Sequence, residues 1–362
     1  MTALAPVNLL DLTVEEAEQV LRAFAESMGA GAYRGSQVLR HLWAAPAVEF
    51  DDMTDVPKAL RAALAERFAI PRLAIEKEEV SMDGTRKFLL RLRDGQLIET
   101  VAIPERGRMT LCVSSQAGCA LKCSFCATGA MGFARNLTAS EIAGQVRELA
   151  LLRPPIVATN IVFMGMGEPL MNWAAVDKAL SILNDPKGFG IGARHITVST
   201  VGWLPGIEAL ARRREQFRLA ISVHAPSDAL RATLMPVNTK FPLADVIAAA
   251  ATFDRRVTFE YVMLGGVNDQ AAHAKALGAL ARRCRAFVNL IPLHPGGSMG
   301  FTPSPRDAMA AFSAALRALG VEVAIRKSRG MDIAAACGQL RVERSAPRRP
   351  VPSDQDREIE KV

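Results

Sequence analysis

Hydrophobic and polar positions recur at two different spacings in the first third of the chain. Between residues 10 and 70, apolar side chains return every three or four positions, which is typical of amphipathic helices. Residues 75–104 are instead rich in strand-forming side chains, and two Asp-Gly turns divide them. We therefore expect an N-terminal helical accessory domain over residues 1–72 and a β-hairpin extension over residues 73–104.

From residue 105 to residue 340 the pattern changes to short apolar strands that alternate with alanine-rich helical runs. The predicted strands cover residues 109–115, 160–165, 195–200, 219–224, 257–264, 287–293 and 321–327. Strands that alternate with helices form a parallel sheet with right-handed crossovers. The chain is thus predicted to be an α/β protein with a full or partial β/α barrel, whose chemistry lies at the carboxyl ends of the strands.

The last residues, 341–362, are rich in Pro, Arg and acidic side chains and lack an apolar face, which predicts disorder. No segment has the run of roughly 18 apolar residues that spans a bilayer, and the N-terminus does not resemble a signal peptide. Six cysteines in such a chain favour free thiols or metal ligands in a reducing compartment, so we expect a cytoplasmic protein.

Charge is unevenly distributed. Residues 1–80 hold 8 basic and 13 acidic side chains, whereas residues 81–362 hold 36 and 24. Three basic clusters lie in the second part, at residues 212–214, 282–285 and 326–329. Each alone is typical of a solvated helix end, but together they favour a polyanion such as RNA as a partner.

The cysteines of the segment GCALKCSFCATG, namely Cys119, Cys123 and Cys126, form a CxxxCxxC motif. Three thiolates suit a [4Fe–4S] cluster with one open iron, whereas a structural zinc site has four ligands. The same spacing also occurs on one helix face, but the strand-like run before the motif and Gly118, Gly129 and Gly132 around it indicate a loop. A four-ligand zinc site with a distant partner remains an alternative.

Other polar residues also follow predicted strands. Gly167 and Glu168 follow the second strand, Ser199 ends the third, and Ser222, Val223 and His224 end the fourth; Asn289 lies in the sixth. Each could be an ordinary strand end, and His224 a packed core histidine. Their shared place at the rim of a barrel nevertheless predicts one common active site.

Several longer motifs extend over most of the chain: FDDMTD (50–55), SMDGTRKF (81–88), IETVAIPE (98–105), TLCVSSQAGCALKCSFCATG (110–129), FMGMGEPLMN (163–172), LMPVN (234–238) and CGQL (337–340). In these motifs the chain resembles the radical S-adenosylmethionine (radical SAM) RNA methyltransferases of the RlmN type, which methylate C2 of adenosine. The resemblance implies the partial (β/α)6 barrel of radical SAM enzymes, with Cys119, Cys123 and Cys126 holding a [4Fe–4S] cluster.

The resemblance also implies a catalytic sequence. One S-adenosylmethionine methylates Cys337, and a second yields a 5′-deoxyadenosyl radical that takes a hydrogen from this methyl group. The carbon then adds to C2 of the adenine, Glu99 accepts the C2 proton, and Cys112 releases the product by forming a disulfide with Cys337. Without the resemblance, Cys112 and Cys337 would be interpreted as packed thiols and Glu99 as a solvent-facing acid.

For the cofactor, the resemblance implies contacts from Gly167, Glu168, Ser199, Ser222, Val223, His224 and Asn289. It implies 23S rRNA and tRNA as substrates, an electron donor such as flavodoxin, and no membrane partner; we expect a monomer. The family's N-terminal region helps to present the RNA, and here it is acidic by count, although Arg34, Arg40, Lys58 and Arg61 could form a basic face. Cys284 matches no motif and is predicted to be structural.

Three alternatives remain at this point. A Cfr-type sibling shares the chemistry but methylates C8 of adenosine. A radical activase that acts on protein would need the cysteine loop but neither Cys112 nor Cys337. A non-catalytic iron–sulfur RNA-binding or ribosome-assembly factor would not cleave S-adenosylmethionine.

Overall fold

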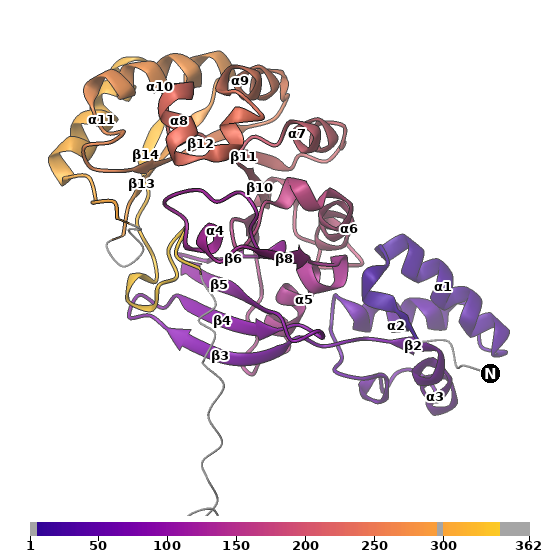
Figure 1. The fold of residues 1–362 in the computed structure, drawn as a ribbon. Coiled ribbons are helices and arrows are strands. Elements are labelled where there is room, and N and C mark those ends of the chain that lie inside the picture. Colours follow the sequence, from indigo (N-terminus) through magenta and orange to yellow (C-terminus); the bar gives the residue numbers. More distant parts are fainter. Residues whose placement is uncertain (1–5, 295–299, 341–362) are drawn as a thin grey trace, which may run out of the picture.

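The structure, a computed structural model, describes residues 6–294 and 300–340. A small helical domain at the N-terminal end lies beside a larger α/β body (Figure 1). The tail predicted to be disordered, 341–362, lies outside the described residues. In the described part of the chain, no helix is long and apolar enough to cross a bilayer.

A ten-stranded sheet organises the α/β body, with strand order β14-β13-β12-β11-β10-β9-β6-β5-β4-β3. Seven strands are parallel: β6 (Arg108–Cys112), β9 (Asn160–Phe163), β10 (Ile196–Thr200), β11 (Arg218–Ser222), β12 (Val257–Met263), β13 (Phe287–Pro292) and β14 (Val323–Ile325). Each coincides with a strand predicted from the hydrophobic pattern. Because β14 and β3 are the two edges, the sheet stays open, and the prediction of a partial α/β barrel is confirmed.

Helices connect successive parallel strands and cover one face of the sheet. They are α5 (Ala139–Ala150), α6 (Trp173–Asn184), α7 (Leu204–Ala211), α8 (Asp228–Leu234), α9 (Leu243–Thr252), α10 (Ala271–Cys284) and α11 (Arg306–Ala318). The start of α5 is fixed by a capping box, in which the Glu141 backbone N–H donates to Thr138 Oγ1 and the Thr138 N–H donates to the Glu141 carboxylate. Because these strands are parallel, their carboxyl ends all lie at the same edge of the sheet.

The β-hairpin extension continues this sheet rather than forming a layer of its own. Strands β3 (Ala74–Val80), β4 (Arg86–Arg91) and β5 (Leu97–Glu105) pair antiparallel, and β5 pairs with β6. Gly84 and Gly95, both with φ +82°, occupy the left-handed positions of the two tight turns that the sequence predicted.

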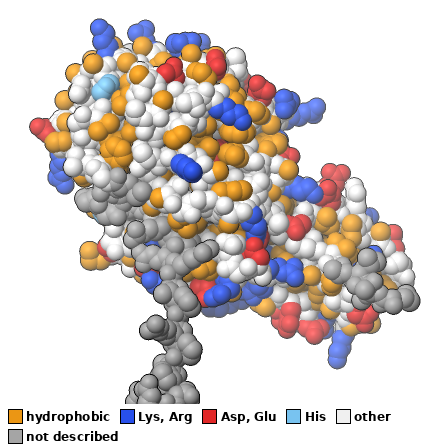
Figure 2. Space-filling model, in the orientation of Figure 1, with side chains coloured by type: hydrophobic (Ala, Val, Ile, Leu, Met, Phe, Trp, Pro, Cys, Tyr) orange, Lys and Arg blue, Asp and Glu red, His pale blue; other side chains and the backbone are white. Residues whose placement is uncertain are grey.

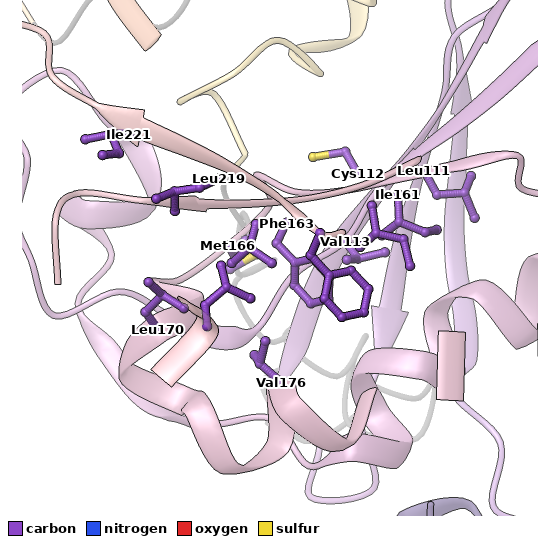
Figure 3. Close-up of a cluster of buried hydrophobic side chains, with 14 of the residues drawn as sticks. Leu111, Cys112, Val113, Ile161, Phe163, Met166, Leu170, Val176, Leu219 and Ile221 are labelled. Atoms are coloured by element: carbon purple, nitrogen blue, oxygen red, sulfur yellow. The ribbon is translucent and has the colours of Figure 1, made fainter. Parts of the chain in front are cut away.

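Alternation along β6 separates the hydrophobic core from the open face of the sheet. Val113, just after the strand, packs with Phe163 and Val176 under the helices, whereas the Cys112 sulfur points to the opposite side (Figure 3). The register pairs Cys112 with Val101 of β5, so Glu99, two residues before Val101, shares the face of Cys112.

The N-terminal domain has its own hydrophobic core, formed by α1 (Val14–Ser27), α2 (Tyr33–Leu42), α3 (Lys58–Arg67) and the short pair β1 (Val7–Asn8) and β2 (Phe68–Ala69). This core extends to Ala143 of α5 and Ile182 of α6. The buried Arg147 guanidinium of α5 donates to the Leu42 carbonyl at 2.9 Å. The domain is thus docked on the outer helices, away from the open face of the sheet.

Candidate active site

A cavity of about 540 Å³ opens at the carboxyl ends of the parallel strands. Its lining comes from the loops after β6, β9, β10 and β11, from β12 and β13, and from the segment after β14. Ten of the predicted site residues line it: Cys112, Cys119, Cys123, Cys126, Gly167, Glu168, Ser199, Ser222, His224 and Cys337. The structure therefore brings together residues that the sequence places up to 225 positions apart.

The cysteine motif lies in a loop between the short strands β7 (Gln116–Gly118) and β8 (Phe133–Asn136). Gly118 has φ +80°, and a Cβ atom there would stand 2.0 Å from the Gly132 carbonyl oxygen. The Cys119 N–H donates to that same oxygen at 2.8 Å. Cys126 then precedes the one-turn helix α4 (Ala127–Ala130). Glycine is thus required where the two arms of the loop meet.

All three thiols of the motif line the cavity, and cysteine thiolates are the ligands that hold iron–sulfur clusters in proteins. Three such ligands would leave one iron of a [4Fe–4S] cluster open. Burial raises the pKa of Cys119 to about 11 and raises that of Cys123 as well, so thiolates form here with a bound metal rather than alone.

Glu168 ties the loop after β9 to the end of β10. Its carboxylate accepts the Leu170 N–H at 3.0 Å and the Val201 N–H at 2.9 Å. Burial raises its pKa to about 7, although these hydrogen bonds oppose the shift. The side chain therefore closes the wall of the cavity where the resemblance predicted a cofactor contact.

The glycines of the GMGEP turn are required by the neighbouring chain. A Cβ at Gly165 would approach Val113 backbone atoms and Ser114 Oγ to 2.7 Å, and one at Gly167, with φ +98°, would approach the Gln116 side chain to 2.5 Å. Both glycines are thus required where the GMGEP turn packs against the strand end that leads into the cysteine loop.

His224 is a buried histidine with a defined tautomer. Its Nδ1 accepts the Val262 N–H at 3.0 Å, so the neutral ring carries its proton on Nε2. Burial, helped by the charge of Arg231, lowers its pKa to about 3. The ring stacks edge-on against Phe125 of the cysteine loop, with centroids 4.8 Å apart. His224 is thus a neutral residue that supports the loop and lines the cavity.

Two predicted contacts, Val223 and Asn289, are not among the described cavity-lining residues. Val223 is fully buried and acts through its backbone, whose carbonyl accepts Arg231 Nε at 3.2 Å. Asn289 donates from Nδ2 to Glu260 Oε1 at 3.0 Å, and Glu260 does line the cavity. The second carboxylate oxygen of Glu260 is buried and accepts no hydrogen bond within the described residues. Sequence reasoning missed Glu260, although a charge within a strand as apolar as 257–264 was a usable signal.

Cys337 reaches the cavity because its segment packs on the cysteine loop. The Gly338 carbonyl accepts the Ala127 N–H at 2.7 Å, and the Leu340 carbonyl accepts Thr128 Oγ1 at 2.6 Å. Cys337 itself is exposed, whereas Cys112 is buried. The two predicted catalytic thiols thus line the same cavity, one on β6 and one on the C-terminal segment.

Arg326 lies near both thiols and Glu260, and these three groups, Cys337 first, raise the pKa of its guanidinium. Burial raises the pKa of Cys112 to about 12; the neighbouring Cys337 adds to this rise, and Arg326 opposes it. The sequence showed Arg326 only as part of a basic cluster, because its partners come from distant strands.

Glu99 lies beside the cavity rather than in its described lining. Its buried carboxylate forms an ion pair with Lys87 Nζ at 3.1 Å, and Lys87 also contacts Glu79 at 3.1 Å. The side chain is thus buried and charged, which differs from the exposed acid that its alternating pattern suggested. Its role as proton acceptor stays a prediction.

Cys284 lies at the end of α10, outside the described lining of the cavity. Its thiol donates to the Ile247 carbonyl at 3.4 Å. Burial raises its pKa to about 11, so it stays a protonated thiol.

Comparison with known proteins shows which family the chain belongs to. Residues 113–277 match the radical SAM superfamily, and residues 7–70 match the ribosomal RNA large subunit methyltransferase N-terminal domain. A probable dual-specificity RNA methyltransferase RlmN from Gemmatimonas aurantiaca is 67% identical over 352 residues, which cover 97% of this chain and 98% of that protein. The chain belongs to the RlmN family.

Other members agree along most of their length. The dual-specificity RNA methyltransferase RlmN from Alkalilimnicola ehrlichii is 46% identical over 92% of this chain and 93% of its own. The crystal structure of a radical SAM methyltransferase from Sphaerobacter thermophilus matches with a TM-score of 0.86 and 45% identity, covering 93% of this chain and all of that one. The RlmN family is a radical SAM family, which implies a [4Fe–4S] cluster and S-adenosylmethionine as cofactors.

Proposed function

We propose that the chain methylates C2 of a specific adenosine in 23S rRNA and of an anticodon-loop adenosine in tRNA; its relatives are named dual-specificity RNA methyltransferases. The observation that carries the proposal is the position of two further thiols in the cavity of the CxxxCxxC loop. Cys112 and Cys337 line that cavity together with Cys119, Cys123 and Cys126. A radical enzyme that acted on protein, or a structural iron–sulfur protein, would have no use for this pair.

In this proposal Cys119, Cys123 and Cys126 hold the cluster, and Glu168, Ser199, Ser222 and His224 line the space for S-adenosylmethionine. Asn289 and Val223 support this wall from behind, through Glu260 and Arg231. The bound cluster and S-adenosylmethionine supply the methyl group and the one-electron chemistry that removes a hydrogen atom from it. Cys337 carries that methyl group as a thioether, because its exposed sulfur can meet both the cofactor and an incoming base.

Release of the product is the task of the remaining residues. Once the Cys337 methyl carbon is bonded to C2, the adduct gives up its unpaired electron, which the cluster held by Cys119, Cys123 and Cys126 would accept, and Glu99 takes the C2 proton. Cys112 Sγ then attacks Cys337 Sγ. A sulfur–sulfur bond forms as the sulfur–carbon bond breaks, and its electron pair leaves with the base, whose new carbon takes up a proton. An external thiol then reduces the Cys112–Cys337 disulfide.

The proposed reaction needs an electron donor but no second copy of the chain. A flavodoxin-type protein would donate the electron that the cluster needs. All the residues invoked come from one chain, so a monomer suffices for the reaction.

Cysteine variants test the proposal. We expect C337A to give neither methylated adenosine nor a covalent protein–RNA species. C112A should accumulate a covalent protein–RNA adduct, since nothing then breaks the Cys337 sulfur–carbon bond. C284A, which removes a half-buried thiol outside the described cavity, should match the wild type. Methylated product from C337A would overturn the proposal.

A further inference from the structure

The three basic clusters found in the sequence lie at different ends of the parallel strands. Residues 212–214 follow α7 and precede β11, and residues 282–285 end α10 and precede β13. Both clusters therefore lie at the amino ends of the strands. Residues 326–329 follow β14 and lie at the carboxyl ends, where all four line the cavity. Only this third cluster is placed to meet a substrate of the site.

A second basic segment stands beside it. The turn between β5 and β6 carries Arg106, and Arg108 begins β6; both side chains are exposed. A surface groove is lined by Pro104, Glu105, Arg106, Arg108, Lys327 and Arg329. Of these residues, Glu105, Lys327 and Arg329 also line the catalytic cavity. The groove thus leads into the cavity, and we name Arg106, Arg108, Lys327 and Arg329 the basic rim.

Contacts between the two segments hold the rim in place. Arg329 lies 3.8 Å from the Glu105 carboxylate and 4.0 Å from that of Asp83. Asp83 also accepts the Gly330 N–H at 3.1 Å. In the same turn, Ser81 Oγ donates to Asp332 at 2.5 Å. The SMDGT turn, a motif without an assigned task, therefore anchors the segment that runs from the rim to Cys337.

The charges of the rim are only partly neutralised. Arg108 pairs with Glu105, and Arg329 shares Glu105 and Asp83. Within residues 6–294 and 300–340, no ion pair joins Arg106 or Lys327 to a carboxylate. A rigid groove with two uncompensated cations at the mouth of a catalytic cavity fits a polyanion better than a neutral ligand.

The N-terminal domain offers a weaker surface of this kind. Arg40 forms an ion pair with Asp55 at 3.0 Å, and Arg61 lies 3.9 Å from Asp51. Arg34 donates to the Asp55 carbonyl. Acidic side chains gather over the N-terminal helices, at the lower right of Figure 2. Two of the four cations suggested for a basic face, Arg40 and Arg61, are therefore compensated by carboxylates.

We propose that the basic rim binds the RNA phosphates that flank the target adenosine, so that the extruded base enters the cavity toward Cys337. This inference rests on the proposed function and adds the binding surface to it. Enzymes that act on a base must take it out of its stack, and phosphate contacts fix position without reading sequence. A rim that contacts only phosphates would serve two RNAs that share no sequence.

The test compares two charge-reversed double variants of the full-length, cluster-loaded protein. R106E/K327E alters the rim, and R212E/R214E makes the same charge change at exposed positions that line neither the groove nor the cavity. Affinity for a 23S rRNA fragment and for tRNA is measured at several salt concentrations, and KM and kcat are measured with both RNAs.

We expect R106E/K327E to weaken binding of both RNAs about tenfold or more at low salt. The slope of log K against log salt should fall by about 1.4, which corresponds to two lost single-strand phosphate contacts at about 0.7 each. KM should rise more than kcat falls, and R212E/R214E should stay within about twofold of the wild type. Equal losses in both variants, or an unchanged salt slope in R106E/K327E, would overturn the proposal. Wild-type protein that binds RNA through the rim but makes no methylated adenosine would instead contradict the proposed function.

Discussion

Arg326 lies beside both catalytic thiols, and replacing it with glutamine should slow release of the methylated RNA by a calculable amount. Cys112 must attack as a thiolate, yet burial raises its pKa to about 12, and Arg326 is the charge that opposes this rise. For an assumed separation of about 8 Å and an effective dielectric constant of about 20, a unit charge contributes about 2 kcal/mol, or about 1.5 pKa units. The R326Q variant therefore has roughly 30-fold less Cys112 thiolate at neutral pH.

The net loss of rate is smaller, because a more basic thiolate is also a stronger nucleophile. With a Brønsted slope of about 0.4–0.5, the 30-fold loss of thiolate becomes a roughly sevenfold loss of rate. The assay follows the decay of the covalent protein–RNA adduct in single turnovers between pH 7 and 9. Both proteins should release RNA about tenfold faster for each pH unit, since the pKa of Cys112 lies above this range.

In a plot of the logarithm of the release rate against pH, R326Q should thus give a line parallel to that of the wild type and below it. R326K, which keeps a cation, should give a line between the two. Cluster absorbance serves as the control for intact folding. A wild-type rate that is independent of pH would refute the reasoning, because Cys112 would then be ionised already. Equal rates for wild type and R326Q would refute the role given to Arg326.

Three further changes have expected outcomes. G118A should abolish most cluster loading, measured as iron per chain, because its Cβ would stand 2.0 Å from the Gly132 carbonyl oxygen in a backbone with φ +80°; wild-type iron content would contradict this reading of the loop. D332A should expose the Cys337 segment to limited proteolysis and slow methylation severalfold at unchanged iron content, because the Ser81 hydrogen bond is lost; equal cleavage rates would exclude the anchor. Burial raises the pKa of Glu168 to about 7, above its unfolded value of 4.5, so the folded state binds the extra proton and stability falls as pH rises from about 4.5 to 7. Urea unfolding of the cluster-free protein should show this loss, of up to about 3 kcal/mol, and E168Q should lack it.

The strands and the cysteine loop were predictable because local patterns encode them. Each parallel strand is an apolar run bounded by polar residues, and parallel strands end at one edge whatever the rest of the chain does. The placement of Cys119, Ser199 and His224 in one cavity follows from that rule alone. Cys112 and Cys337 required the family resemblance, because a single thiol carries no local signal.

Glu260 and Arg326 escaped prediction for a different reason. Their significance lies in the electrostatic interaction between Glu260 of β12 and Arg326 of the segment after β14, which no spacing in the sequence expresses. The burial of Glu99 was not predicted for the same reason: its alternating pattern suggested an exposed acid, and its partner Lys87 comes from the neighbouring strand. Charges buried by tertiary packing are visible only once the partner elements are placed.

The most direct test of the proposed function is mass spectrometry of nucleosides from 23S rRNA and tRNA. The RNAs are incubated anaerobically with cluster-reconstituted protein, S-adenosylmethionine and a reductant. We predict 2-methyladenosine in both RNA pools. If 8-methyladenosine forms instead, the enzyme has the Cfr-type specificity, and if 5′-deoxyadenosine is released with neither product, the radical chemistry is present but the RNA substrate proposed here is wrong.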